Sequence, residues 1–229
     1  MTSSDHTPRC VGIIMDGNRR WAKERGLPTL EGHRQGGNTL ERIAQAAHDA
    51  GVDTLILYAF STENWKRSPE EVSYLLELMH TYLTDHAESL LKNGARFRVI
   101  GDRSRLPQDI QEKIDALEER TKDAEGGTIA FAVSYGGRTD LVQAVNTLIK
   151  KGVTEVSEED ISNALWTHDL PDPDLIIRTS GERRLSNFLT WNSVYAELFF
   201  TDTYWPDFSN EEFNALLAEY ATRERRRGA

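Results

Sequence analysis

The sequence predicts one α/β domain over residues 1–229, with an open, largely parallel sheet of six strands and helices on both faces. Three observations support this fold class. The β-rich runs alternate mostly with helix-like segments, they are as continuously apolar as strands buried on both faces, and the length suits one domain. The six runs are "CVGIIM" (10–15), "TLILYAF" (54–60), "RFRVIG" (96–101), "TIAFAVSY" (128–135), "DLIIRT" (174–179) and "VYAELFF" (194–200).

The segment after the first strand breaks at Asp16-Gly17-Asn18 and continues as a cationic, helix-forming run. A clearer amphipathic helix is expected over residues 38–51, where Leu40 and Ile43 begin an apolar face and Gly51 ends the helix.

The strongest helix pattern in the chain begins after the second strand. Ser68 is a suitable N-cap, Pro69 takes the first helical position, and the two glutamates that follow favour the positive end of the helix dipole. An apolar face continues to the stop at Asn93-Gly94. Further helices are expected over 107–123, 139–151, 157–168 and 209–224.

Composition excludes several classes of protein. The net charge of −10 argues against a non-specific nucleic-acid binder. A single cysteine, Cys10, allows neither an internal disulfide nor a cysteine-rich metal site. No apolar run approaches the ~18 residues typical of a membrane span, and the first residues lack the apolar core of a signal peptide. These features favour the cytoplasm.

Three strands run directly into loops of unusual composition: "MDGNRRW", "STENWKR" and "RTSGERRLSNF". In open α/β sheets, ligands bind beyond the carboxyl ends of the strands. Arg, Asn, Ser and an acid recur together in these loops, which points to a polyphosphate held by arginine and Mg²⁺. A surface ion-pair network is the alternative. Phosphate-loop, dinucleotide, zinc-protease, esterase and DDxxD motifs are absent from the sequence.

Five segments, in order, resemble the cis-prenyltransferase family, most closely its bacterial undecaprenyl-diphosphate synthases, or isoprenyl transferases. They are "MDGNRRWAKERG", "GHRQG", "YAFSTENWKR", "RTSGERRLSNFLTW" and "YAELFFTDTYWPDF", and the resemblance runs from about Val11 to Gly228. It implies a homodimer with an apolar tunnel between helix and sheet. It also implies condensation of isopentenyl diphosphate onto an allylic diphosphate, with farnesyl diphosphate expected as primer. The expected product is the undecaprenyl carrier lipid of cell-wall synthesis.

The resemblance also implies roles for individual residues. Asp16 would be the catalytic acid and a Mg²⁺ ligand, Asn64 would lie where the proton is removed, and Glu197 would be the second carboxylate for Mg²⁺. A neutral amide is a poor base, so we expect Asn64 to orient substrate while the departing diphosphate takes the proton. The substrate-binding residues implied are Gly17, Asn18, Arg19, Arg20, Trp21, Thr29, His33, Ser61, Thr62, Glu63, Trp65, Arg67, Arg178, Arg184, Leu185 and Ser186.

The sequence departs from the family pattern at Thr29, and its ending suggests a further role. Thr29 stands where the family often has an arginine, and offers only a hydroxyl to phosphate. The chain ends in Arg226-Arg227-Gly228, an Arg-x-Gly ending that in such dimers reaches the neighbouring site, although a solvated basic helix end is the simpler interpretation.

Product release implies a peripheral contact with the membrane.

Two rival functions and one structural question stay open. A non-catalytic prenyltransferase-like subunit would be expected to lack Asp16 or Asn64, and a phosphate-binding regulatory module would not need a tunnel helix. Product length cannot be read from the sequence. The apolar residues that are either simple core or tunnel lining are Tyr58, Phe60, Leu76, Met79, Phe131 and Val133.

Overall fold

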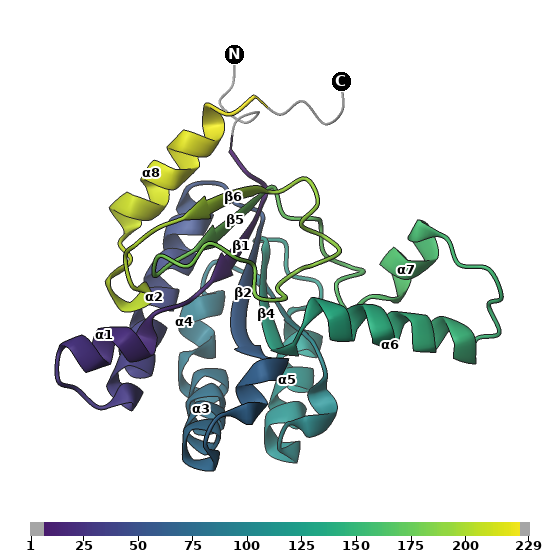
Figure 1. Ribbon diagram of the computed structural model, residues 1–229, viewed down its shortest axis with the longest axis horizontal. Helices are drawn as coiled ribbons and strands as arrows, with labels where there is room; N and C mark the ends of the chain where they lie inside the picture. The colour runs from purple at the N-terminus through teal and green to yellow at the C-terminus, as the bar shows by residue number, and fades with distance from the viewer. Residues whose placement is uncertain (1–6, 225–229) are drawn as a thin grey trace.

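The computed structural model describes residues 7–224. Its six strands form one sheet in the order β3-β4-β2-β1-β5-β6, with every neighbouring pair parallel (Figure 1). The predicted open parallel sheet is confirmed. The strands are β1 (Cys10–Ile14), β2 (Thr54–Ser61), β3 (Arg96–Ile100), β4 (Thr128–Tyr135), β5 (Leu175–Arg178) and β6 (Glu197–Phe200).

The helices follow the strands in the expected alternation. The α-helices are α1 (Asn18–Glu24), α2 (Thr29–Asp49), α3 (Pro69–Thr81), α4 (Ala87–Leu91), α5 (Gln108–Thr121), α6 (Gly137–Lys150), α7 (Glu158–Ala164) and α8 (Asn210–Ala221). Short 3₁₀ turns are η2 (Thr62–Lys66), η4 (Arg103–Arg105) and η5 (Trp205–Asp207), and η3 (Tyr82–His86) is a turn of π-helix.

The strand order makes β1 and β5 neighbours, although they are far apart in sequence. From β1 the chain moves to β2 on one side, and β5 and β6 are added on the other side. Such a reversal is where open α/β sheets bind ligands, beyond the carboxyl ends of the strands. Ile14 of β1 pairs with Arg178 of β5, so the residues after both strands emerge side by side at this edge.

Side chains alternate between two apolar clusters along each strand. Val11 and Ile13 of β1 belong to the larger cluster, which α2, α5 and α8 cover. Cys10 and Ile14 face the other way, where Phe188 and neighbouring loop residues cover the sheet.

Helices α6 and α7 form an arm that extends away from the sheet (Figure 1). Their apolar side chains make a separate cluster that contains Ala144, Leu148, Ile161 and Leu165.

Several element boundaries differ from the prediction, among them the end of the helix expected over 157–168, which lies at Ala164. The helix expected from residue 38 begins at Thr29, because its glycines are sites of close approach rather than breaks: a Cβ at Gly32 would lie 2.0 Å from the carbonyl oxygen of Asn18. The helix expected to continue past residue 81 contains the π-turn η3. The sixth strand begins at Glu197 instead of residue 194, which changes the position of that carboxylate.

Candidate active site

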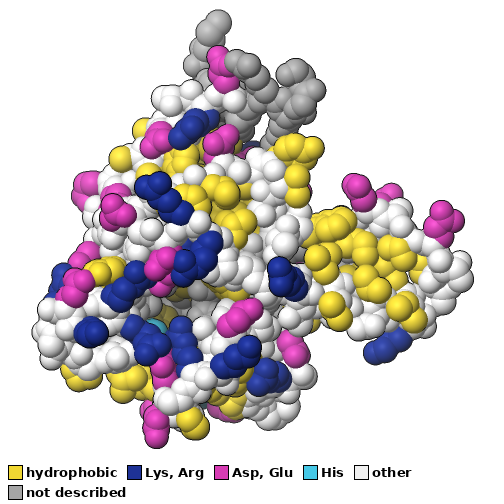
Figure 2. Space-filling view, viewed as in Figure 1, with side chains coloured by type: hydrophobic (Ala, Val, Ile, Leu, Met, Phe, Trp, Pro, Cys, Tyr) yellow, Lys and Arg dark blue, Asp and Glu magenta, His cyan; other side chains and the backbone are white. Residues whose placement is uncertain are grey.

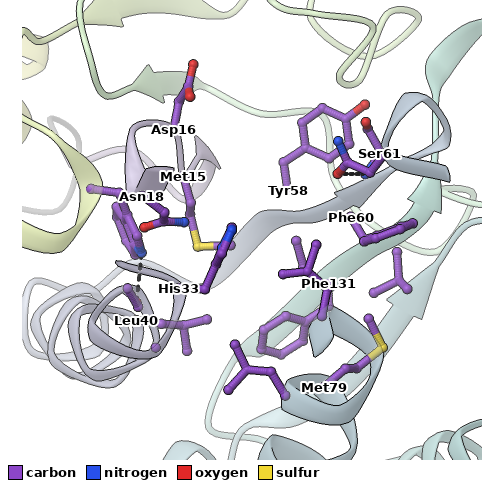
Figure 3. Close-up of a pocket in the computed structure, with 18 of the residues that line it drawn as sticks. Met15, Asp16, Asn18, His33, Leu40, Tyr58, Phe60, Ser61, Met79 and Phe131 are labelled. Atoms are coloured by element: carbon purple, nitrogen blue, oxygen red, sulfur yellow. Dashed lines mark hydrogen bonds between the residues drawn. The ribbon is translucent and has the colours of Figure 1, made fainter. Parts of the chain in front are cut away.

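One cavity of about 1280 Å³ opens at the carboxyl edge of the sheet and continues between the sheet and the helices that cover it. Figure 3 shows its two regions: Asp16, Asn18 and Ser61 lie toward one end, and Phe131 and Met79 lie toward the other. We call the first region the polar mouth and the second the apolar interior. Lys and Arg side chains gather around the hollow beside α1 in the space-filling view (Figure 2).

Asp16 follows β1 and is held from the neighbouring strand. Its backbone N–H donates to Oγ1 of Thr179 at 3.0 Å, and its Oδ2 accepts from Nη2 of Arg178 at 2.8 Å. A second guanidinium, that of Arg20, lies 3.5 Å from the same oxygen. Asp16 thus lies between two guanidinium groups at the end of β1.

Arg178 is only 4% exposed, and its guanidinium organises the neighbouring loop. Nη1 donates to Oγ of Ser186 at 2.7 Å and to the carbonyl oxygen of Arg184. Nε is buried without a hydrogen-bond partner in the described part of the chain. Because buried polar atoms usually have a hydrogen-bond partner, this N–H is a donor available to a ligand.

A second cationic group surrounds Glu71 on the helical side of the mouth. Arg67 lies 3.0 Å from the Glu71 carboxylate, Arg19 lies 3.7 Å away, and Nε2 of His33 lies 3.8 Å away. Burial, with a further contribution from the charge of Arg67, lowers the pKa of His33 to about 4. His33 is therefore neutral near pH 7.

The turn at Gly17 requires glycine. Its φ is +107°, and a Cβ there would lie 2.7 Å from the Tyr204 ring. This turn directs the chain into α1, where Oδ1 of Asn18 is buried without a hydrogen-bond partner among the described residues. Gly36 of α2 leaves the space for that amide, because a Cβ would lie 2.6 Å from it. Thr29, at the start of α2, also lines the cavity.

The η2 turn brings Ser61, Glu63 and Asn64 to the mouth. The Ser61 N–H donates to Oδ1 of Asn64 at 3.0 Å, as part of a reciprocal capping arrangement. The amide oxygen of Asn64 is therefore occupied in holding the turn. Its Nδ2 is left to contact a ligand, so this side chain is suited to donate a hydrogen bond rather than to accept a proton.

Of the predicted site residues, thirteen line the cavity: Asp16, Gly17, Asn18, Arg19, Arg20, Thr29, His33, Ser61, Glu63, Asn64, Arg67, Arg178 and Ser186.

The two predicted tryptophans do not line it. The Trp21 indole donates to Asp207 at 2.7 Å, and the Trp65 indole donates to Ser134 at 2.9 Å. Both rings anchor the segments that carry the site, α1 and η2.

Three other predicted residues lie beside the cavity without lining it. The Thr62 hydroxyl donates to Glu63, and Leu185 packs against the apolar cluster on the second face of the sheet. The Arg184 guanidinium pairs with Glu182. Only its carbonyl oxygen contacts the site, through Arg178.

Glu197, predicted as the second carboxylate for Mg²⁺, does not line the cavity within one chain. Glu197 begins β6 and pairs in register with Leu175, which pairs with Val11. Val11 precedes Asp16 by five residues, roughly 16 Å along a parallel strand. The two carboxylates therefore approach opposite edges of the sheet.

The structure adds lining residues that the sequence reasoning left out. Lys23 lies one helical turn beyond Arg19 on α1, a spacing that could have identified it. Asn187 follows Ser186, and nothing in its sequence context distinguished it. Tyr58 was considered only as core or tunnel lining, but its hydroxyl donates to the carbonyl oxygens of Tyr135 and Ser186 at the mouth.

The apolar interior confirms the predicted tunnel between helix and sheet. Phe131 and Val133 contribute the sheet side, and Met79 contributes the helical side. Leu76 is part of the core without lining the cavity. Phe97 is the sheet residue that lines the cavity farthest from the mouth. Through β4 and β2 it is in register with Val11, near the start of β1.

Asp16 and Glu63 are the carboxylates that line the cavity at its polar mouth. No group of three or more His, Cys, Asp or Glu side chains suited to a metal occurs within residues 7–224. The contacts of the Asp16 carboxylate with Arg178 and Arg20 both use Oδ2. Mg²⁺ is commonly bound by one or two carboxylates together with substrate phosphates. Asp16 fits that pattern if the ligand supplies the phosphate oxygens.

Comparisons with known proteins agree with this geometry. Residues 14–228 match the prenyltransferase family model for undecaprenyl diphosphate synthase. The chain belongs to this family. The isoprenyl transferases of Fusobacterium nucleatum and Aquifex aeolicus are each 46% identical to it over 221 residues, with 96% of both chains covered.

Two solved structures share the fold. Lavandulyl diphosphate synthase from Lavandula x intermedia, in complex with dimethylallyl diphosphate, has a TM-score of 0.94 at 35% identity, with 99% of this chain and 100% of that chain covered. A probable undecaprenyl diphosphate synthase from Campylobacter jejuni has a TM-score of 0.82 at 35% identity, covering 97% and 99%. The chain is thus a prenyltransferase of the undecaprenyl diphosphate synthase family. None of its described helices is both long and apolar enough to span a membrane.

Proposed function

We propose that this prenyltransferase is Mg²⁺-dependent and condenses isopentenyl diphosphate onto an allylic diphosphate, with farnesyl diphosphate as primer. Its product would be a long cis-polyprenyl diphosphate that serves as the undecaprenyl carrier of cell-wall synthesis. The observation that carries the proposal is the continuity of a cationic mouth with an apolar interior in one cavity of about 1280 Å³. Such a cavity suits a ligand with a diphosphate head and a growing hydrocarbon tail.

The two diphosphates would occupy two sides of the mouth. Arg19, Arg20 and His33 would hold the allylic diphosphate, and Asn18 would contribute the N–H groups of its amide as donors. Arg178 and Ser186 would hold isopentenyl diphosphate, and the buried Nε of Arg178 supports this assignment. Arg184 would join them by leaving Glu182.

In the reaction, the allylic C–O bond breaks and a C–C bond forms to the terminal alkene carbon of isopentenyl diphosphate. A proton then leaves the new chain and a double bond forms, while diphosphate is released. Mg²⁺, held by Asp16 and phosphate oxygens, would neutralise charge on the leaving group. Arg20 would supply fixed positive charge at the same position. Asn64 would orient the isopentenyl group, and the departing diphosphate would accept the proton.

We further propose a homodimer. Val142, Val145 and Ile149 lie on one face of α6 and are exposed, and Tyr195 and Leu198 are exposed at the β6 edge. Figure 2 shows apolar side chains gathered over the arm. Exposed apolar patches of this kind mark protein interfaces. The predicted contact of Arg226 and Gly228 with a neighbouring site lies outside the described residues.

A cytoplasmic enzyme with a peripheral membrane contact would suit this product. Leu27 lies between α1 and α2, Leu30 lies in the first turn of α2, and both are exposed. Leu27 also lines the cavity. Both leucines would lie where the hydrocarbon product meets the lipid surface.

One assay tests the proposed activity. Purified protein is incubated with labelled isopentenyl diphosphate, farnesyl diphosphate and Mg²⁺, and the lipid extract is separated by chain length. We expect a long polyprenyl diphosphate that disappears when the metal is chelated. Absence of product with every allylic primer would contradict the proposal and favour a non-catalytic subunit or a phosphate-binding module.

A further inference from the structure

Asn187 occupies a sharp turn beside the polar mouth. Its φ is +68°, and that of Ser186 before it is +47°, so two consecutive non-glycine residues adopt the left-handed region. Such residues carry strain that surrounding contacts must offset, although asparagine tolerates this conformation better than most. The contacts that hold this turn in place should therefore be identifiable.

Those contacts come from the amino end of α6. The Gly137 N–H donates to the backbone oxygen of Asn187 at 2.7 Å, and the Arg138 N–H donates to its side-chain Oδ1 at 2.9 Å. The other end of the amide points to η2, where Nδ2 donates to Oε1 of Glu63 at 3.2 Å. Space for this amide depends on Gly136, because a Cβ there would lie 2.6 Å from Nδ2.

The turn that Asn187 occupies also places the buried guanidinium of the mouth. Oγ of Ser186 accepts from Arg178, which in turn donates to Asp16. The Ser186 carbonyl oxygen accepts from Tyr58. A shift of the turn would therefore move the acceptors that orient Arg178.

We propose that Asn187 is a positioning residue for prenyl transfer. Its amide ties η2 to the amino end of α6 and thereby fixes Ser186 and Arg178 for isopentenyl diphosphate. This inference rests on the proposed function. Because α6 also carries the exposed apolar face, the same amide links the proposed dimer helix to the mouth.

The chemistry suits an amide. One end donates to a carboxylate and the other accepts from a backbone N–H, and an amide offers both groups on separate atoms of a short side chain. Asn187→Asp keeps the acceptor toward α6, and a negative charge at a helix amino end is favourable. It removes the donor toward Glu63 and places two carboxylates together.

The test compares Asn187→Asp with Asn214→Asp, a matched control at an exposed position of α8. We expect Asn187→Asp to melt near the wild-type temperature but to lose roughly 10- to 100-fold in kcat/KM for isopentenyl diphosphate, the loss typical of a hydrogen bond to a charged group. Asn214→Asp should match wild type in both. A residue that only caps α6 would leave kcat/KM unchanged in Asn187→Asp, and that result would overturn the proposal.

A compensating variant separates positioning from added charge. Glu63→Gln with Asn187→Asp restores the wild-type net charge and exchanges donor and acceptor across the contact. We expect it to be several-fold more active than Asn187→Asp, as coupled neighbours are in double-mutant cycles. A double variant no better than Asn187→Asp would contradict a direct role for this pair.

Binding of isopentenyl diphosphate, measured by calorimetry, gives a readout without turnover. Weaker binding to Asn187→Asp than to the double variant supports the proposal, and equal binding to wild type and Asn187→Asp contradicts it. Wild-type protein that binds isopentenyl diphosphate but makes no product would instead count against the proposed function alone.

Discussion

Arg178 is the residue on which most of the polar mouth depends. Its buried guanidinium contacts Asp16 from β1, and Ser186 and Arg184 from the following loop, so one side chain joins segments more than 160 residues apart. Burial of an unpaired cation is strongly unfavourable, which explains why a carboxylate lies at 2.8 Å. Asp16 therefore has a structural partner as well as a proposed metal.

The first prediction concerns Asp16→Ala. We expect product formation to fall by roughly 10²- to 10³-fold, the loss usual for one preorganised charge-stabilising group. We also expect a lower melting temperature, because Arg178 loses its counter-ion. Asp16→Asn is the control: it keeps the volume and one oxygen of the side chain but removes its charge. Full turnover by Asp16→Ala at saturating Mg²⁺ would contradict the proposed metal role.

The second prediction concerns His33. Since burial lowers its pKa to about 4, the folded state resists protonation that the unfolded state accepts near pH 6.5. Its contribution to stability is therefore present above pH 6.5 and is lost as the pH falls from about 6.5 toward 4.

NMR titration of the imidazole, assigned with His33→Gln, should give a midpoint far below that of a free histidine. Addition of diphosphate should raise the midpoint, because a nearby anion favours the charged ring. A midpoint near 6.5 in the free protein would mean that the ring is solvated.

At the scale of helices and strands, local sequence patterns determine some parts of the fold and not others. Continuous apolar runs identified the sheet, because parallel strands are buried on both faces. The start of α2 at Thr29 was not predicted, because the apolar pattern that indicated the helix begins only at Leu40. Gly37 accommodates Tyr82 of η3, whose hydroxyl would lie 1.7 Å from a Cβ at that position. This requirement comes from a residue 45 positions later in the chain and has no local signal.

The third prediction concerns the apolar interior of the cavity, which both α4 and β3 help to line. Ala87 and Phe97 both line the cavity there and both are buried. Ala87→Leu adds carbons to this region and should shift the products toward shorter chains. Each CH₂ contributes only ~0.8 kcal/mol on burial, so affinity does not by itself stop elongation, and steric closure must. Chain-length separation of the extracted lipid measures the shift. An unchanged distribution in a folded variant would place the tunnel floor elsewhere.

At the scale of the whole molecule, the motif resemblance identified most residues of the site but did not show which of them lie close together in space. Thirteen predicted residues gather around one cavity because they follow strands that end at the same sheet edge. Glu197 does not, because its place depends on where β6 begins and how it pairs with β5. Strand register is set by tertiary packing, so the distance from Glu197 to Asp16 could not be read from the motif.

The fourth prediction concerns the exposed face of α6. Ile149 is 62% exposed, so a charge there is tolerated by the isolated chain but not by a buried interface. We expect Ile149→Glu to shift the protein from dimer to monomer in light scattering, with its helical circular dichroism kept. Val156→Glu, which changes an exposed valine outside α6, is the control. A dimer that survives Ile149→Glu would exclude this face as its interface.

The fifth prediction joins the dimer to the site through the Arg226-x-Gly228 ending, which lies outside the described residues. An arginine is suited to a site that must bind two diphosphates, and glycine allows the backbone to approach closely. If this ending reaches the neighbouring site, Asp16→Ala chains have a dead site and an intact tail, while Arg226→Ala chains have the reverse. Each variant alone should then be nearly inactive.

Co-refolding the two variants in equal amounts makes half of the dimers mixed, and each mixed dimer holds one complete site if the tail acts across the interface. Roughly one quarter of the wild-type activity should therefore return in a symmetric dimer. Mixing without unfolding is the control, since subunits that do not exchange cannot complement one another. If the tail serves its own chain, every mixed dimer pairs a site without Asp16 with a site without Arg226, and the refolded mixture stays as inactive as its parents.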